Sequence, residues 1–154
     1  MKRIIVMILA AVMAISCFAA CSGNGEKGDA KEAFDPEKAF ERLRTEVKFD
    51  AELEDASEYA EFVFGDAAKG GEIKMYQAGG KLADALILFK LKDEADFDGV
   101  EAAVKDYIET AKLEADRYNP QELKKLENTF VRKSGLYYIV CITGDSETAR
   151  SILN

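Results

Sequence analysis

Apolar residues follow three different patterns along the chain. From Ile4 to Ile15 they form one unbroken run, "IIVMILAAVMAI". Over residues 36–47 and 97–118 they recur every three or four positions, which is typical of a helix with one buried face. Over residues 73–91 and 129–143 they alternate or form short runs, which is typical of strands. The pattern predicts an apolar leader followed by a domain of helices and strands.

Capping residues set the limits of the two main helices. Asp35 is a suitable N-cap and Pro36 suits the first helical position, which predicts a helix over 36–47. Asp93 or Asp96 is expected to cap the longest helix, and Asn119-Pro120 to end it. Its expected buried stripe comprises Phe97, Val100, Val104, Tyr107, Ile108, Ala111, Ala115 and Tyr118.

Two hairpins flank the long helix. In the first, Gly79-Gly80 is the expected turn, and Ala85–Phe89 reads as a central strand covered on both faces. In the second, the turn is expected near residues 133–135, and Leu136–Ile142 is again apolar on both faces. In the acid-rich stretch between Phe49 and Gly70, the residues Tyr59, Phe62 and Phe64 fit a short helix or a short strand, and a short helix or turn near residues 56–63 is favoured.

A short helix capped by Asp145 or Ser146 is expected to close the chain. The long helix allows a crossover from the first hairpin to the second. The expected fold is therefore α+β: an antiparallel sheet of about four strands with a long helix packed across it, plus N- and C-terminal helices.

Cys21 lies where the apolar leader gives way to the polar tract "SGNGEKGDAKE". Lys2 and Arg3 precede the apolar run, as in a signal peptide. Phe18–Cys21 resembles the bacterial lipobox, whose cysteine receives a diacylglyceryl group as a thioether and becomes the new N-terminus. Phe18 stands where leucine is usual, and Cys17 is a competing position. An ordinary secretory signal and an uncleaved apolar helix are the alternatives.

The leader divides the chain into three expected parts. Residues 1–20 are the lipoprotein signal peptide, residues 21–33 the lipidated cysteine with a flexible tether, and residues 34–154 one α+β domain. We expect the protein on the extracytoplasmic face of the cell membrane, held there by the lipid anchor at Cys21.

The amino-acid composition limits which partners the protein can bind and which kinds of catalysis it can perform. Without Lys2 and Arg3 the chain has 19 basic and 29 acidic residues, a net charge of −10, which argues against nucleic acid and against direct binding to anionic lipid. The chain has no histidine, which excludes Ser-His-Asp and Cys-His catalysis and histidine-based zinc sites. We expect no cofactor, no metal and no enzymatic activity. Cys141, the remaining thiol, is expected to pack in the core.

Four other features have ordinary structural explanations. Glu94–Gly99 opens like a calcium loop, but Lys105 stands where the loop needs a bidentate glutamate, so a helix start is favoured. Gly65–Gly71 lacks the GK[ST] of a phosphate loop and is expected to be a mobile loop. Tyr59 and the pair Tyr137-Tyr138 are expected at core edges, with an aromatic contact surface as the alternative. The acidic residues expected to form solvated surface are Asp50, Glu52, Glu54, Asp55 and Glu58.

The order of these motifs resembles a family of small lipoproteins of Gram-positive gut bacteria that carries a domain of unknown function. The resemblance covers roughly residues 35–153. It rests on a strand ending in K-x-K-D, the long helix, Y-x-P, the hairpin "TFVRKSGLYYIVCIT" and the helix "DSETARSIL". It implies the anchored location and the α+β fold, and it carries over no catalytic or binding residues.

Three functions fit these observations. The first is a non-catalytic lipoprotein that binds a protein or envelope component, which an exposed apolar patch beyond a few hundred Å² would favour. The second is a small-ligand or ion-binding accessory lipoprotein of a transport system, which a concave polar pocket would favour. The third is a carboxylate-based enzyme, which two buried, close carboxylates in a cleft would favour.

Overall fold

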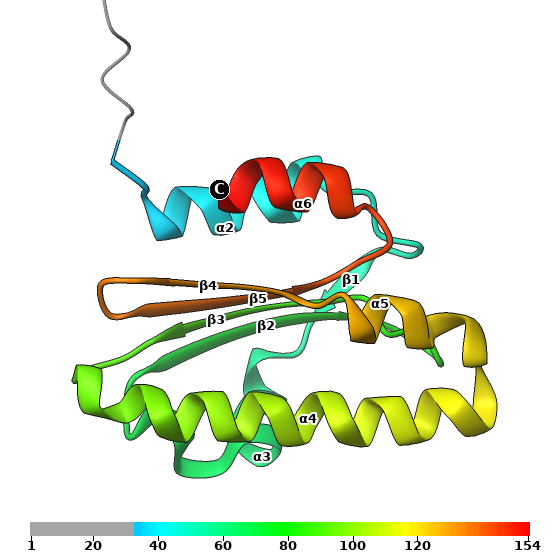
Figure 1. Ribbon diagram of the computed structural model, residues 1–154. Helices are drawn as coiled ribbons and strands as arrows, with labels where there is room; N and C mark the ends of the chain where they lie inside the picture. Colours follow the sequence, from blue (N-terminus) through cyan, green and yellow to red (C-terminus); the bar gives the residue numbers. More distant parts are fainter. Residues whose placement is uncertain (1–32) are drawn as a thin grey trace, which may run out of the picture. The chain divides into compact units, whose positions relative to one another are not determined.

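The computed structural model describes residues 33–154 (Figure 1). The expected signal peptide and the lipidation site at Cys21 lie outside the described residues. In the described part, no helix is both long enough and apolar enough to cross a membrane.

One antiparallel sheet forms the centre of the domain, with the strand order β1-β2-β3-β5-β4. The fold is α+β, as predicted from the sequence. The strands are β1 (Leu53–Asp55), β2 (Glu72–Ala78), β3 (Ala85–Lys90), β4 (Phe130–Ser134) and β5 (Tyr137–Ile142).

Helices cover both faces of this sheet (Figure 1). The pair α2 and α6 packs on one face, and α3 and the long α4 pack on the other. The helices are α2 (Pro36–Glu46), α3 (Ser57–Phe64), α4 (Phe97–Tyr118), α5 (Leu123–Glu127) and α6 (Ser146–Leu153), with short 3₁₀ turns η1 (Gly65–Ala68), η2 (Glu94–Asp96) and η3 (Pro120–Glu122).

The unbroken apolar runs of β3 and β5 supply two separate cores. In β3, Leu86 and Leu88 pack with α2 and α6, whereas Ile87 and Phe89 pack with α3 and α4. Successive side chains on a strand point to opposite faces, so a strand covered on both sides must be apolar throughout. The prediction that both strands are central and buried is confirmed for β3 and for Tyr138–Ile142 of β5.

The long helix makes the predicted crossover. It leaves the end of β3, and the chain then returns through α5 to β4 at the sheet edge. Strand β5 follows β4 and lies between β4 and β3.

The predicted caps are confirmed at α2 and α6, whereas Asp93 caps the η2 turn that leads into α4, and Asp96 makes no capping hydrogen bond. The Asp35 carboxylate accepts hydrogen bonds from the N–H groups of Glu37 and Lys38, both at 3.1 Å. The Asp93 carboxylate accepts one from the Ala95 N–H at 2.9 Å, which places a helix start, not a calcium loop, at Glu94–Gly99. At the start of α6, the Asp145 carboxylate accepts one from Thr148 at 3.3 Å.

Two of our expectations about strands differ from the structure. The sheet has a fifth strand, β1, whose Leu53 pairs with Ala78 of β2. It is only three residues long and two of them are exposed acids, so its alternation is too short to recognise. Leu136, expected in the second central strand, lies in the hairpin turn before β5 and is 37% exposed. The predicted helix near residues 56–63 is confirmed as α3.

Tyr118 was wrongly placed in the buried stripe of the long helix. It is 63% exposed, and its ring packs instead beneath the Lys81 ammonium, 4.1 Å from the ring centroid. This residue sits in the last turn of α4, where helical spacing alone does not show whether the sheet still lies beneath it. The other stripe residues are buried or pack against the core, namely Phe97, Val100, Val104, Tyr107, Ile108, Ala111 and Ala115.

Candidate functional site

An exposed aromatic pair lies on the outer side of α3. Tyr59 is 51% exposed and Phe62 is 79% exposed, and their ring centroids are 5.2 Å apart. An aromatic side chain has about 150–250 Å² of surface, so the pair presents roughly 250 Å² of apolar area to solvent. Single exposed apolar residues are common, but here two exposed rings are in contact, tilted by 33° to each other, and form a small patch.

The helical period puts this pair outward because α3 is anchored by its other side. Ala60 and Phe64 are buried, and the Phe64 ring packs at 5.0 Å from Phe89 of the sheet and 5.4 Å from Tyr107 of α4. Ser57 fixes the start of the helix, since its Oγ accepts a hydrogen bond from the N–H of Met75 in β2 at 3.0 Å. Residues 59 and 62 therefore cannot turn inward without unseating Phe64.

A polar hollow of about 760 Å³ lies beside the start and end of α3. Four carboxylates line it, against the single ammonium group of Lys69. The full lining is Ser57, Glu58, Glu61, Gly65, Asp66, Ala68, Lys69, Gly70, Gly71, Glu72 and Ile73. We refer to Tyr59 and Phe62, together with Glu58, Glu61, Asp66 and Glu72, as the α3 surface.

The Lys69 ammonium does not neutralise these carboxylates, because it is already paired. Its Nζ lies 2.8 Å from Oδ1 of the buried Asp96, at the start of α4. The hydrogen bond to Asp96 raises the pKa of Lys69 above its ordinary value. The α3 surface is therefore both aromatic and acidic.

A second cluster of charges lies at α5 and is buried except for Asp50, whose side chain is 58% exposed. Nζ of Lys125 lies 2.6 Å from Oδ2 of Asp84, 2.6 Å from Oδ2 of Asp50 and 2.9 Å from Oε2 of Glu122. Lys125 is 9% exposed, Glu122 5% and Asp84 1%. We refer to these four residues as the Lys125 cluster.

Three separate segments bring the Lys125 cluster together. Lys125 is in α5 and Glu122 in η3, Asp84 directly precedes β3, and Asp50 lies between α2 and β1. Glu122 Oε2 also accepts a hydrogen bond from the N–H of Ala83 at 2.8 Å. The cluster thus ties the chain before β3 to the connection that follows the long helix.

The charges of the cluster hold the lysine protonated. Burial lowers the pKa of Lys125, but the hydrogen bonds to Asp50, Asp84 and Glu122 raise it by more, so it lies well above the ordinary lysine value. Among the buried side-chain nitrogen and oxygen atoms of the described residues, Oδ1 of Asp84 is the one without a hydrogen-bond partner. A hollow of about 610 Å³ adjoins Lys125 from the side of Gly144 and Ser146.

This arrangement brings together the buried carboxylates that a carboxylate-based enzyme would need. However, one oxygen of Asp84 and one of Glu122 are bound to the same ammonium, and Asp84 lines neither this hollow nor that of α3. In the described part of the chain, no group of Asp, Glu or Cys side chains is arranged to hold a metal ion. We therefore interpret the Lys125 cluster as a structural ion cluster.

The structure confirms some of the residue roles expected from the sequence and corrects others. Asp50 is exposed as expected, with its side chain 58% exposed, and it also contacts the Lys125 ammonium. Cys141 is a buried free thiol, as predicted, and burial raises its pKa to about 12, with the charges of Asp84 and Asp145 adding to the shift. Tyr59 lies at the exposed surface, not at a core edge.

The two tyrosines of β5 are structural. Tyr138 is buried in the core beneath α4, and the hydroxyl of Tyr137 donates to Oε1 of Glu37 in α2 at 2.7 Å. Tyr138 therefore lies in one core and Tyr137 at the edge of the other, in agreement with the expectation of core-edge positions.

The sequence reasoning missed Asp84, Glu122 and Lys125. One signal was present for Asp84, an isolated acid directly before the wholly apolar run of β3. Glu122 and Lys125 carry no local signal, since they are polar residues in a short, polar helical turn.

Comparison with known proteins bears on the central part of the domain. Residues 71–143 match the family described as "Domain of unknown function (DUF4358)". The matched stretch runs from β2 through α4 to β5, and agrees with the domain-of-unknown-function part of the resemblance seen in the sequence. It contains Asp84, Glu122 and Lys125, whereas α3 lies outside it. No curated protein and no solved structure matches the chain.

Proposed function

We propose that this protein is a lipid-anchored, extracytoplasmic binding module that contacts a protein or cell-envelope partner through the α3 surface. The observation that carries the proposal is the exposed ring pair Tyr59 and Phe62, with Phe62 79% exposed. Burying an aromatic side chain is worth about 1.5–3 kcal/mol, so a partner that covers this pair gains affinity without any change in the fold.

The position of α3 in the domain supports this role. The described chain begins just before α2, on the opposite face of the sheet from α3 (Figure 1). If Cys21 is lipidated, the tether joins the domain at the α2 face and leaves the α3 surface open to a partner. The lipobox-like Phe18–Cys21 and the polar tract that follows it support the anchor.

A small-ligand accessory role is the second candidate, and the hollow of about 760 Å³ favours it. Its lining is polar and charged, whereas small-molecule sites are mostly apolar. A small ligand in the hollow would also leave the exposed rings of Tyr59 and Phe62 unexplained. We therefore place the binding-module role first.

Site-specific photo-cross-linking in the native host tests the proposal. A benzoylphenylalanine replaces Phe62 in the full chain, and the same group replaces Leu113 of α4, which is 63% exposed, as the matched control. We expect a discrete cross-linked species from position 62 that is absent from position 113 and is lost when Tyr59→Ser is added. No adduct at position 62, or the same adducts at both positions, would overturn the proposal.

A further inference from the structure

We propose that the partner of the α3 surface is a short basic protein segment, whose Lys or Arg side chains lie across Tyr59 and Phe62 and reach the carboxylates of the hollow. This inference rests on the proposed function and names the chemistry of its partner. Long basic side chains suit such a surface, because their aliphatic stems pack on apolar area while their charged ends remain in a polar environment.

Unpaired charge is the first observation behind this proposal. Within residues 33–154, no ion pair reaches Glu58, Glu61 or Asp66, and Glu72 has only a long contact, 3.5 Å from Nζ of Lys74. Lys69 also lines the hollow, but its ammonium group is already in an ion pair with Asp96. Acids crowded together repel one another, and a cation placed among them relieves that repulsion.

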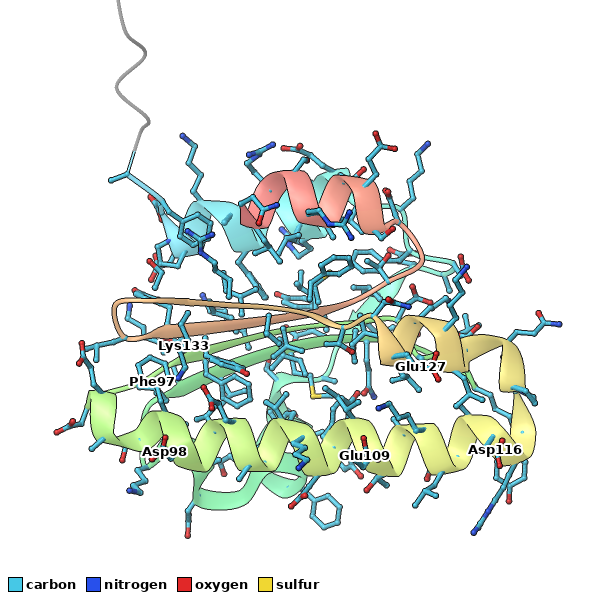
Figure 2. All side chains as sticks on the ribbon, in the orientation of Figure 1. Phe97, Asp98, Glu109, Asp116, Glu127 and Lys133 are labelled. Atoms are coloured by element: carbon cyan, nitrogen blue, oxygen red, sulfur yellow. The ribbon has the colours of Figure 1, made fainter. Side chains whose placement is uncertain are left out.

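The second observation concerns other aromatic rings of the domain that are exposed, as Tyr118 is, or half-buried. Lys and Arg side chains lie over six rings of the described chain: Lys81 over Tyr118 at 4.1 Å, Arg132 over Phe34 at 4.3 Å, Lys133 over Phe97 at 4.7 Å, Lys90 over Tyr137 at 5.3 Å, Arg44 over Tyr76 at 5.6 Å and Arg150 over Phe130 at 5.9 Å. Lys133 and Phe97 are labelled in Figure 2.

Tyr59 and Phe62 differ from those six rings. They contact each other at a tilt of 33° and have no cation above them in the described part of the chain. A cation over an exposed ring is worth about 0.5–1 kcal/mol, and more where water is excluded. The α3 surface therefore offers both halves of a cation site, the ring faces and the carboxylates, without the cation.

Charge and size argue against other occupants. A second copy of this chain carries the same large negative charge, and an anionic lipid surface is repelled as well. The exposed aromatic area of roughly 250 Å² is small compared with a standard protein interface of about 800 Å² per partner. It suits a short segment with one or two anchoring side chains.

A titration with octalysine tests the inference directly. The probe is added to the ¹⁵N-labelled chain from residue 21 onward, with Cys21→Ser, and amide shifts are followed. Glu58→Gln/Glu61→Gln removes two charges from the α3 surface. Asp116→Asn/Glu127→Gln removes the same charge from exposed positions at the far end of α4 and in α5, both labelled in Figure 2.

We expect shifts concentrated in residues 57–73, binding at least five-fold weaker in the α3 variant, and binding within two-fold of the unmodified chain in the control. Tyr59→Ser/Phe62→Ser should also weaken binding. Shifts spread over the whole acidic surface, or equal weakening by the two charge variants, would overturn the inference.

Repeating the cross-linking in Glu58→Gln/Glu61→Gln separates the two proposals. Loss of the adduct from position 62, with retention in Asp116→Asn/Glu127→Gln, supports both. An adduct that survives in both variants upholds the binding role and refutes the basic partner. An absent adduct in the unmodified chain refutes the binding role itself.

Discussion

The ammonium of Lys125 lies 2.6 Å from the carboxylate of Asp84, at a position where Asp84 is only 1% exposed. The two residues are 41 positions apart in the sequence. Their pairing joins the entrance of the central strand β3 to the segment that follows the long helix. A charge buried this deeply requires a partner, so the pair links the stability of both segments.

Removing the lysine should destabilise the domain strongly. Lys125→Met leaves Asp84 and Glu122 buried without their cation, and breaking a buried pair in this way costs about 3–5 kcal/mol. Urea unfolding followed by circular dichroism measures the change. Lys124→Met, at the exposed neighbouring position, is the matched control and should stay within about 0.5 kcal/mol of the unmodified chain.

The double variant Asp84→Asn/Lys125→Met separates charge from packing. Since the worst consequence of Lys125→Met is an uncompensated buried carboxylate, adding Asp84→Asn should cost less than the sum of the two single changes. Strict additivity would show that Lys125 does not act through Asp84.

Cys141 should be unreactive in the folded protein. Burial raises its pKa to about 12, so the thiolate that reacts with disulfide reagents is scarce and shielded at pH 8. In the chain from residue 21 with Cys21→Ser, Cys141 is the only thiol. Labelling with Ellman's reagent should be negligible without denaturant and should reach one thiol per chain in urea. Rapid stoichiometric labelling of the native protein would show that the strand is accessible.

Replacing each of two phenylalanines of α3 by alanine should change the free energy of unfolding by very different amounts. Phe62→Ala should change the free energy of unfolding by about 0.5 kcal/mol or less, because the side chain is 79% exposed. Phe64→Ala should cost about 3–5 kcal/mol, because its ring is 4% exposed and packs between Phe89 and Tyr107. Thermal and urea unfolding check both values. A large loss from Phe62→Ala would make that ring structural and weaken its assignment to binding.

Gly71 should not tolerate a side chain. A Cβ at this position would lie 2.3 Å from the backbone oxygen of Lys90, against which β2 pairs. Gly71→Ala must therefore displace β2 from β3, and we expect a loss of about 1–3 kcal/mol in urea unfolding. Gly79→Ala is the control, since nothing lies within 4 Å of its Cβ. Equal stability of the two variants would show that the strand adjusts freely.

The elements of this fold could be predicted because their signals are local. Asp35 and Asp93 cap the helices that they precede, and the apolar run from Ala85 to Phe89 is central as expected. Local reasoning failed where neighbours outside the element decide the outcome. Tyr118 continues the helical stripe but is 63% exposed, with Lys81 over its ring, and β1 is stabilised by its pairing with β2.

The candidate sites were harder to predict than the fold. The Lys125 cluster joins residues 41 and 75 positions apart, and no spacing in the sequence brings Asp84 and Asp50 to the same ammonium. The α3 surface was partly foreseen, since Tyr59 was weighed as a contact residue. Which face of α3 packs inward depends on Phe64 meeting Phe89, a contact that only the folded chain shows.

The anchor is tested most directly by the mass of the mature N-terminus, purified from membranes of the native host. Our account predicts a chain that begins at Cys21 and carries a diacylglyceryl group, and a Cys21→Ala variant that lacks the lipid and is no longer held by it. An unmodified N-terminus, or cleavage at another position, would contradict the account. The protein would then be secreted or held by its intact apolar segment, and a partner would have to be sought elsewhere than at the membrane surface.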